Sequence, residues 1–168
     1  DSGNGETAYG YGWVNYELGI IQEAMNAFEE VANIRFLETN NRNTANISWA
    51  SLDSDDSGGS DILGWSYLPL SDNGDFAGIT AINYEPYYSE TMEVDGVLDP
   101  GSYYFLTFTH ELGHALGLEH PHDSNNYYGT FPGVDSSSDG GDNGLNASPY
   151  TVMTYNDVGA NNYVPDSN

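Results

Sequence analysis

Hydrophobic residues recur at helical spacing in two segments of the chain. In the first segment, residues 17–31, the apolar positions are Ile20, Ile21, Ala24, Ala27, Phe28 and Val31. In the second, which begins at the candidate N-cap Ser102, they are Phe105, Leu106, Leu112, Ala115 and Leu116. Apolar residues spaced three and four apart line one face of an α-helix, so both segments are predicted to be amphipathic helices.

Four shorter segments are typical of β-strands, with alternating or continuous apolar residues bounded by polar loops. They span residues 34–38, 46–50, 62–68 and 78–84. Pro69 ends the third segment, because proline has no N–H to donate to a neighbouring strand. A helix, several strands and a second long helix predict an α+β fold with one mostly contiguous sheet. No internal repeat or linker is visible, so we expect one domain over residues 1–168.

The second predicted helix carries a motif of histidines and a glutamate. Residues 110–120 read H-E-x-x-H-x-x-G-x-x-H. His110 and His114 are one helical turn apart, so both imidazoles project from one face and can occupy two corners of a zinc tetrahedron. Glu111 stands beside the first histidine and can reach a water molecule on the metal. The spacing therefore predicts a zinc site with a neighbouring base.

The third histidine of the motif needs a change of chain direction. His120 lies six residues after His114, so a continuous helix would carry it to a different face. Gly117 can adopt a positive φ, end the helix and return His120 as a third ligand. Three protein ligands leave the fourth position open, which is typical of a catalytic zinc site. The alternative is an acidic helix with surface histidines, which would make this spacing a coincidence.

Composition narrows the possible partners. The 168 residues include 26 Asp and Glu but only 2 Lys and Arg, giving a formal net charge of −24 at pH 7. Binding to phosphate groups needs Lys and Arg, so nucleic acid and anionic membranes are poor partners. The chain has no Cys, which excludes disulfide bonds and thiol chemistry. No apolar run reaches membrane-spanning length and no signal-peptide pattern opens the chain, so we expect a mature, soluble protein.

Three acidic clusters are candidate calcium sites. They occupy residues 53–61, 72–75 and 135–142. Carboxylates and backbone carbonyls are the ligands that Ca²⁺ prefers. A solvated acidic surface is the favoured interpretation of any single cluster, but at least one calcium site is expected overall. Asp123 could support a zinc ligand or bind calcium. His122 is expected to be a loop residue, because the zinc ligand set is already complete without it.

The motif resembles that of the metzincin clan of zinc peptidases. Leu118 and Pro121, on either side of the third histidine, look like the serralysin branch. Residues 151–155 read Thr-Val-Met-Thr-Tyr and resemble the Met-turn of the clan, with a tyrosine position similar to serralysins and astacins. The resemblance implies a metzincin catalytic domain of the α+β class. It would have a twisted, mostly parallel sheet, two long helices and an irregular lower half.

The activity that this resemblance implies is peptide hydrolysis by a zinc metalloendopeptidase. Zinc on His110, His114 and His120 would polarise the scissile carbonyl and activate water. Glu111 would be the general base, taking the proton of the water and passing it to the leaving amine. Strand 62–68 would pair with the substrate by β-augmentation, unless it is an ordinary internal strand.

Two residues of the Met-turn-like segment are implied to belong to the site. Tyr155 would be an additional zinc ligand that swings off the metal and donates a hydrogen bond to the oxyanion. Its alternative interpretation is a core tyrosine near a turn. Met153 would be a structural floor beneath the zinc.

The resemblance also implies a setting for the enzyme. A serralysin-like protease would be secreted, extracellular and bacterial, would act on a protein or peptide substrate, and would be a monomer. A propeptide or a proteinaceous inhibitor is a further expected partner, and Ca²⁺ an expected structural cofactor. Serralysins continue into a C-terminal helix and a calcium-binding β-roll, and residues 156–168 resemble neither. Two alternatives stay open: an autoprocessing domain, and a catalytically silent calcium or adhesion module of a larger surface protein.

We expect added NaCl or Ca²⁺ to raise the melting temperature of the protein. A net charge of −24 with 2 basic residues leaves the self-repulsion of the folded state largely uncompensated. Salt screens this repulsion and a bound divalent cation neutralises part of it. Thermal melts across separate NaCl and CaCl₂ titrations measure the effect, and a flat response to both would contradict the expectation.

Overall fold

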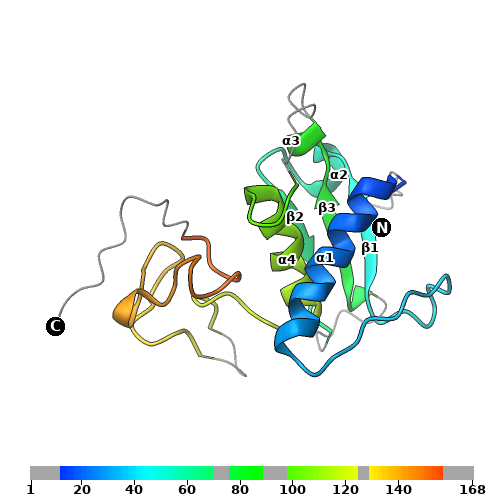
Figure 1. The fold of residues 1–168 in the computed structure, drawn as a ribbon. Helices are drawn as coiled ribbons and strands as arrows, with labels where there is room; N and C mark the ends of the chain where they lie inside the picture. Colours follow the sequence, from blue (N-terminus) through cyan, green and yellow to red (C-terminus); the bar gives the residue numbers. More distant parts are fainter. Residues whose placement is uncertain (1–11, 70–75, 89–97, 125–128, 157–168) are drawn as a thin grey trace. The chain divides into compact units, whose positions relative to one another are not determined.

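The fold is known from a computed structural model that describes residues 12–69, 76–88, 98–124 and 129–156. Two compact units divide the chain, unit 1 ending at Gly117 and unit 2 beginning at Leu118. Unit 1 contains α1 (Asn15–Val31), β1 (Ser48–Leu52), α2 (Ser54–Ser57), β2 (Gly64–Ser66), β3 (Ile79–Asn83), α3 (Glu85–Tyr88) and α4 (Tyr103–Ala115) (Figure 1). The described part of unit 2 is irregular apart from the short 3₁₀ helix η2 (Asp142–Gly144).

Three strands form the described sheet, with β3 in the middle. β1 runs parallel to β3, with Ser48 opposite Ile79, whereas β2 runs antiparallel to it, with Gly64 opposite Ile82. The predicted α+β class and the strands near 46–50, 62–68 and 78–84 are confirmed. The described sheet is mixed, however, where a mostly parallel sheet was expected. β2 forms one of its edges.

Residues 34–38 do not form the predicted strand. They are irregular, and the N–H of Phe36 donates a 2.7 Å hydrogen bond to Oε1 of Glu29 in α1. Oε2 of the same glutamate lies 3.7 Å from the guanidinium of Arg35. A helix side chain therefore satisfies a backbone group that a neighbouring strand would otherwise satisfy. The apolar pattern of a short segment does not distinguish these two arrangements.

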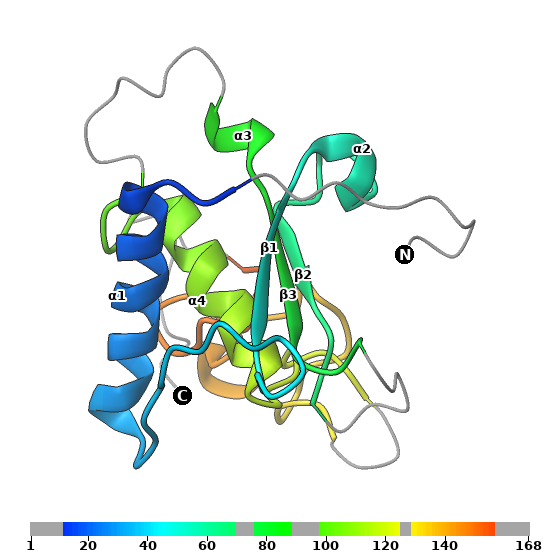
Figure 2. The same ribbon diagram turned by 90° about the vertical axis from the view of Figure 1, so that its right-hand side faces the viewer.

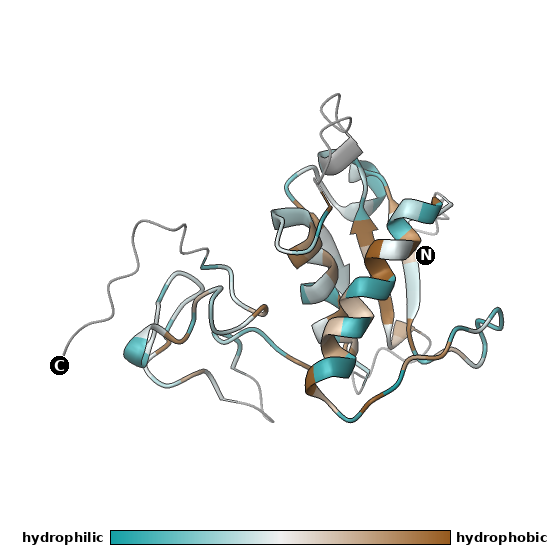
Figure 3. Ribbon diagram, viewed as in Figure 1, coloured by the Kyte–Doolittle hydropathy of each residue, from teal (hydrophilic) through white to brown (hydrophobic). Residues whose placement is uncertain are grey.

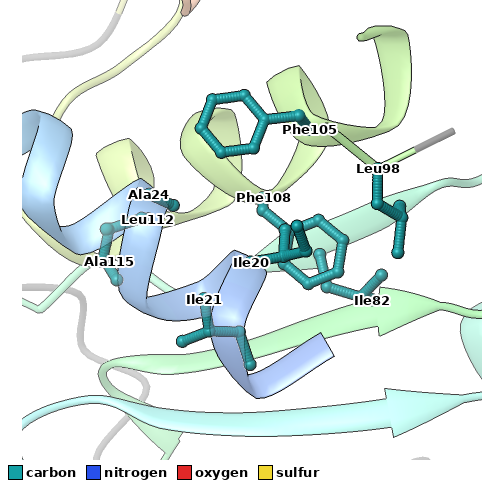
Figure 4. Packing of buried hydrophobic residues seen from close by; sticks show 9 residues of the cluster. All are labelled: Ile20, Ile21, Ala24, Ile82, Leu98, Phe105, Phe108, Leu112 and Ala115. Atoms are coloured by element: carbon teal, nitrogen blue, oxygen red, sulfur yellow. The ribbon is translucent and has the colours of Figure 1, made fainter. Parts of the chain in front are cut away.

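One hydrophobic core holds the two long helices against the sheet (Figure 4). Its buried members are Ile20, Ile21 and Ala24 of α1, Ile82 of β3, Phe105, Phe108, Leu112 and Ala115 of α4, and Leu98. Phe108 is fully buried, and the ring of Trp49 stacks on it with centroids 6.0 Å apart. Figure 2 shows α1 and α4 on the same side of the strands. Because α4 contacts α1, β2 and β3, the core holds the histidine helix beside β2.

Helix α1 shows the amphipathic pattern that its sequence predicts. In Figure 3 brown and teal residues alternate from turn to turn along it. Its first turn is capped by Glu17, whose Oε2 accepts a 2.9 Å hydrogen bond from the N–H of Val14. The helix thus begins two residues before the predicted start. Val31, which the helical period placed on the buried side, is 83% exposed at the last turn.

Both ends of α4 lie where residue chemistry predicts them. Oγ of Ser102 accepts a 3.1 Å hydrogen bond from the N–H of Phe105, which confirms the N-cap. The helix ends at Ala115, and Gly117 follows with a φ of +96° while its N–H bonds the carbonyl of His114 at 2.9 Å. Leu106 and Leu116, which the periodicity assigned to the buried side, are only partly buried.

No helix in the described ranges combines the length and the apolar character needed to cross a bilayer.

We expect Gly117→Ala to lower the free energy of unfolding by about 1–2 kcal/mol, because a Cβ disfavours a left-handed backbone. Gly19→Ala is the matched control. An added Cβ at Gly19, within α1, meets nothing within 4 Å, and alanine favours the helix, so this change should be neutral or stabilising. Urea denaturation of the three proteins measures the difference. Equal midpoints for the two variants would contradict the role of Gly117 at this turn.

Candidate metal centre

Helix α4 places the first two histidines of the motif in a relation that suits a shared metal ion. The ring centroids of His110 and His114 are 4.8 Å apart, and the ring planes cross at 85°. A metal ion bound by an imidazole nitrogen lies in the plane of the ring, so crossing planes can share one point near both rings. His114 is buried, and His110 is partly exposed. The i, i+4 spacing alone predicts this relation.

Glu111 lies on the same helix and points into the interior of unit 1. Its side chain is 5% exposed, and its buried Oε2 has no hydrogen-bond partner within the described residues. Burial raises the pKa of Glu111 from 4.5 to about 8. A buried carboxylate without a partner is costly, and such groups gather at functional sites. Two imidazoles beside an unpaired carboxyl oxygen are a donor set that fits zinc and a reacting water.

In unit 2, Asp123 orients the third histidine of the motif. Oδ2 of Asp123 lies 2.7 Å from Nδ1 of His120 and accepts a 3.3 Å hydrogen bond from its backbone N–H. A carboxylate only accepts, so Nδ1 carries the proton and Nε2 keeps its lone pair for a metal. The sequence left Asp123 open between supporting a ligand and binding calcium, and this geometry favours support.

The ionisation of Asp123 agrees with that role. Its partial burial on its own would raise the pKa of the carboxyl group. The side-chain and backbone hydrogen bonds from His120, together with favourable electrostatic interactions with His120 and His122, outweigh this effect and hold the pKa of Asp123 below its ordinary value. Asp123 is therefore a carboxylate at neutral pH.

His122 packs against the third histidine. Donor atoms of His120, His122 and Asp123 lie within 4.8 Å of one another, which makes these three a possible metal group. The rings of His120 and His122 are stacked, however, with centroids 5.0 Å apart and planes only 18° from parallel. Stacked planes share no nearby point, so both rings cannot bind one ion in this arrangement. The geometry favours a packing role for His122.

Tyr155 lies beside the same ring. Its centroid is 4.5 Å from that of His120 and 5.2 Å from that of His122. The side chain is 60% exposed, so the alternative of a core tyrosine is wrong. Met153, by contrast, is buried, and its N–H bonds Oγ1 of Thr151 at 3.1 Å. Unit 2 thus brings Tyr155 to a histidine of the motif.

Sequence reasoning missed the residue that anchors this segment. Asn146 is fully buried, and its Oδ1 accepts a 2.6 Å hydrogen bond from Oγ1 of Thr154. The backbone carbonyl of Asn146 accepts a 2.9 Å hydrogen bond from Nδ2 of Asn156. Its own Nδ2 donates to the carbonyl of Asp139 at 2.7 Å. The side chain of Asn146 therefore connects residues 151–156 to the preceding loop. No local sequence pattern predicts this connection.

In the described residues, aspartates of the acidic clusters cap turns of the backbone. Oδ1 of Asp53 accepts a 2.9 Å bond from the N–H of Asp56 and caps α2, so residues 53–61 include a short helix. Oδ1 of Asp139 accepts a 3.1 Å bond from the N–H of Gly141. Neither cluster supplies a close group of three potential ligands in the part of the chain that the structure describes. Residues 72–75 lie outside the described residues.

Comparisons with known proteins show the family of the chain. Residues 15–133 match the matrixin family, Peptidase_M10. Serralysin A of Dickeya chrysanthemi is 33% identical over 119 residues, which are 68% of this chain and 24% of the relative. A serralysin of Photorhabdus luminescens is 30% identical over 132 residues, 79% of this chain and 25% of the relative. The metalloprotease AprA of Pseudomonas entomophila is 28% identical over 111 residues, 65% and 21% respectively. The chain spans about a quarter of the length of these relatives.

In the metal-free protein, Glu111→Gln should stabilise the fold more at pH 8 than at pH 5. The folded carboxyl group has a pKa of about 8 and its ordinary value is 4.5, so the folded state keeps a proton that the unfolded chain releases. The stability that this proton contributes is fully present below the unfolded pKa and is lost as the pH rises through the folded pKa. The difference should reach a few kcal/mol, since one pKa unit corresponds to about 1.4 kcal/mol.

Urea denaturation in the presence of a chelator measures this dependence at several values between pH 5 and pH 8. Glu30→Gln, on the exposed side of α1, is the matched control for loss of one acidic charge. A Glu111→Gln advantage that does not change with pH would contradict the assignment.

Proposed function

The chain belongs to the matrixin family of peptidases and is a serralysin-like metzincin, and from this premise we propose that it carries the catalytic site of a zinc-dependent endopeptidase. One observation carries the proposal. The buried carboxyl group of Glu111 has no hydrogen-bond partner for Oε2 in the described chain, and Glu111 lies on α4 between two histidines whose ring planes cross. Burying such a group without a partner lowers the stability of the fold, whereas the same group can accept and donate a proton during hydrolysis.

The proposed zinc ligands are His110, His114 and His120. The crossing rings on α4 support the first two. The hydrogen bond from Nδ1 of His120 to Asp123 supports the third, because it leaves Nε2 available. The spacing of the motif in the sequence is the reason for assigning all three histidines to one ion. When bound, zinc would supply Lewis-acid chemistry, polarising the scissile carbonyl and activating water.

Proton transfer is proposed for Glu111. As a carboxylate it accepts the proton of the attacking water, and as a carboxylic acid it donates that proton to the leaving amine. Both steps need a group whose pKa lies near the working pH; burial raises the pKa of Glu111 to about 8 in the metal-free chain, and the positive charge of a bound zinc ion would lower it from there. The dry surroundings that raise this pKa also strengthen the interaction of the carboxylate with the water.

The proposed roles of the Met-turn-like segment are stabilisation of the oxyanion and support. Tyr155 would donate a hydrogen bond from its phenol to the developing oxyanion, and would be a possible additional zinc ligand at rest. Its exposed side chain beside His120 supports both roles. Met153 would provide a buried floor for the site, as its 3% exposure suggests.

The proposed substrate is a protein or peptide bound in an extended conformation. β2 is an edge of the described sheet, and an edge strand can bind an extended chain through its backbone groups. β2 also packs against α4, which carries Glu111. Binding along β2 would therefore bring a peptide bond beside the general base.

Secretion into a saline medium is part of the proposal, and the net charge of −24 supports it. The relatives named above come from bacteria, and we propose a bacterial source for this chain as well. Calcium as a structural cofactor, a propeptide or protein inhibitor as partner, and a monomeric state complete the proposal. Only the acidic composition supports calcium.

Glu111→Gln should lower kcat on a fluorogenic peptide by about 10²–10⁴-fold, because general acid–base catalysis contributes that much. Zinc content, measured by atomic emission, should stay the same. His120→Gln should lose zinc, whereas its neighbour His122→Gln should keep it.

Activity that survives both Glu111→Gln and chelation would exclude the proposed mechanism. Parallel expression of a longer precursor with and without Glu111→Gln separates the autoprocessing alternative. That alternative requires cleavage of the precursor without any cleavage of casein. A zinc-loaded chain that cleaves neither would be the silent module.

A further inference from the structure

A glycine in the edge strand faces the proposed general base. Gly64 begins β2, where its backbone is extended and outside the left-handed region. A Cβ added at this position would lie 2.9 Å from Cγ and 3.2 Å from Oε1 of Glu111. It would also lie 2.9 Å from the carbonyl oxygen of Ala81 in β3. Glycine is therefore needed here for space and not for an unusual φ. A glycine inside a strand often marks such a close approach.

The two crowded neighbours differ in their freedom to move. The carbonyl of Ala81 belongs to the backbone of β3, which pairs with β2 on one side and β1 on the other. The side chain of Glu111 ends in freely rotating bonds, and its Oε2 has no hydrogen-bond partner among the described residues. A methyl group at position 64 would therefore push the side chain of Glu111 aside, and β2 would also have to move away from the carbonyl oxygen of Ala81.

The position of the Glu111 carboxylate thus depends on packing. A hydrogen bond to Oε2 would anchor the group, and the described chain supplies none. The side chain instead fills the space that a Cβ at position 64 would occupy. The same strand is the edge along which we propose that a peptide binds. One backbone segment would then place both the base and the scissile bond.

We propose that Gly64 is a positioning residue for Glu111: the missing side chain in β2 sets where the carboxylate of the general base lies. The inference rests on the proposed function, since it assigns Glu111 the role of base. It adds a determinant on a different element, distant in sequence from the zinc-binding motif. Gly64 itself touches no reacting atom in this scheme.

The kinetic test compares Gly64→Ala with the parent enzyme. A displaced base should lower kcat by roughly 10–100-fold, because a misplacement of about 1 Å can cost that much. KM and zinc content should stay within about twofold of the parent values, since no histidine atom is among the three nearest to the added Cβ. Gly19→Ala is the control for a glycine-to-alanine change in open space and should leave kcat unchanged.

A double-mutant cycle shows whether Gly64 acts through Glu111. In the Glu111→Ala background the crowded Cγ and Oε1 are gone and only the contact with Ala81 remains, so Gly64→Ala should lower the residual kcat clearly less than it lowers the kcat of the parent. An unchanged kcat in Gly64→Ala alone would overturn the proposal. So would an equal fall in both backgrounds, because the methyl group would then act through another part of the site.

The same cycle measured by thermal melts separates this inference from the proposed function. Gly64→Ala should lower the melting temperature of the parent by several degrees, and clearly less in the Glu111→Ala background. If Gly64→Ala does not fold, the double variant should regain a cooperative melt. Equal losses in both backgrounds would overturn the inference. A parent that cleaves nothing refutes the proposed function, while the melts still decide the packing of Gly64 on Glu111.

Discussion

The site depends on the burial of one carboxyl group, that of Glu111, whose Oε2 has no hydrogen-bond partner in the described chain. Glu111 is 5% exposed, and its surroundings raise its pKa to about 8. A fold accepts this cost only where surrounding packing holds the group in place. Here α4 presents Glu111 to β2, and the bare backbone of Gly64 leaves room for it. At this contact the fold loses stability by burying Glu111 and gains a positioned general base for the proposed reaction.

The rest of unit 1 can be understood as the scaffold for that contact. Phe108 and Leu112 on α4 are fully buried in the core that α1 and β3 complete. They belong to the same helix as the histidines, so the packing of the core fixes the direction in which the histidines project. From the three strands of the described sheet, the site uses one backbone edge, β2, which packs against α4.

Unit 2 supplies its share through hydrogen bonds more than through a core. Asp123 fixes the ring of His120, and Asn146 ties the segment of Tyr155 and Met153 to the preceding loop. The described part of unit 2 has one short 3₁₀ helix, so hydrogen bonds from polar side chains hold its site residues in place, as helices and strands do in unit 1. This agrees with a metzincin catalytic domain, whose lower half is irregular. It also explains why the sequence of unit 2 shows little hydrophobic periodicity.

The sequence by itself determined the features that depend on neighbours within one or two helical turns. These are the two long helices, the cap at Ser102, the left-handed turn at Gly117 and the relation of His110 to His114. Only the tertiary structure decided the mixed strand pairing, the irregular course of residues 34–38, and the approach of Gly64 to Glu111. Periodicity and capping are properties of a local segment, whereas pairing and steric contact arise between segments that lie far apart in the chain.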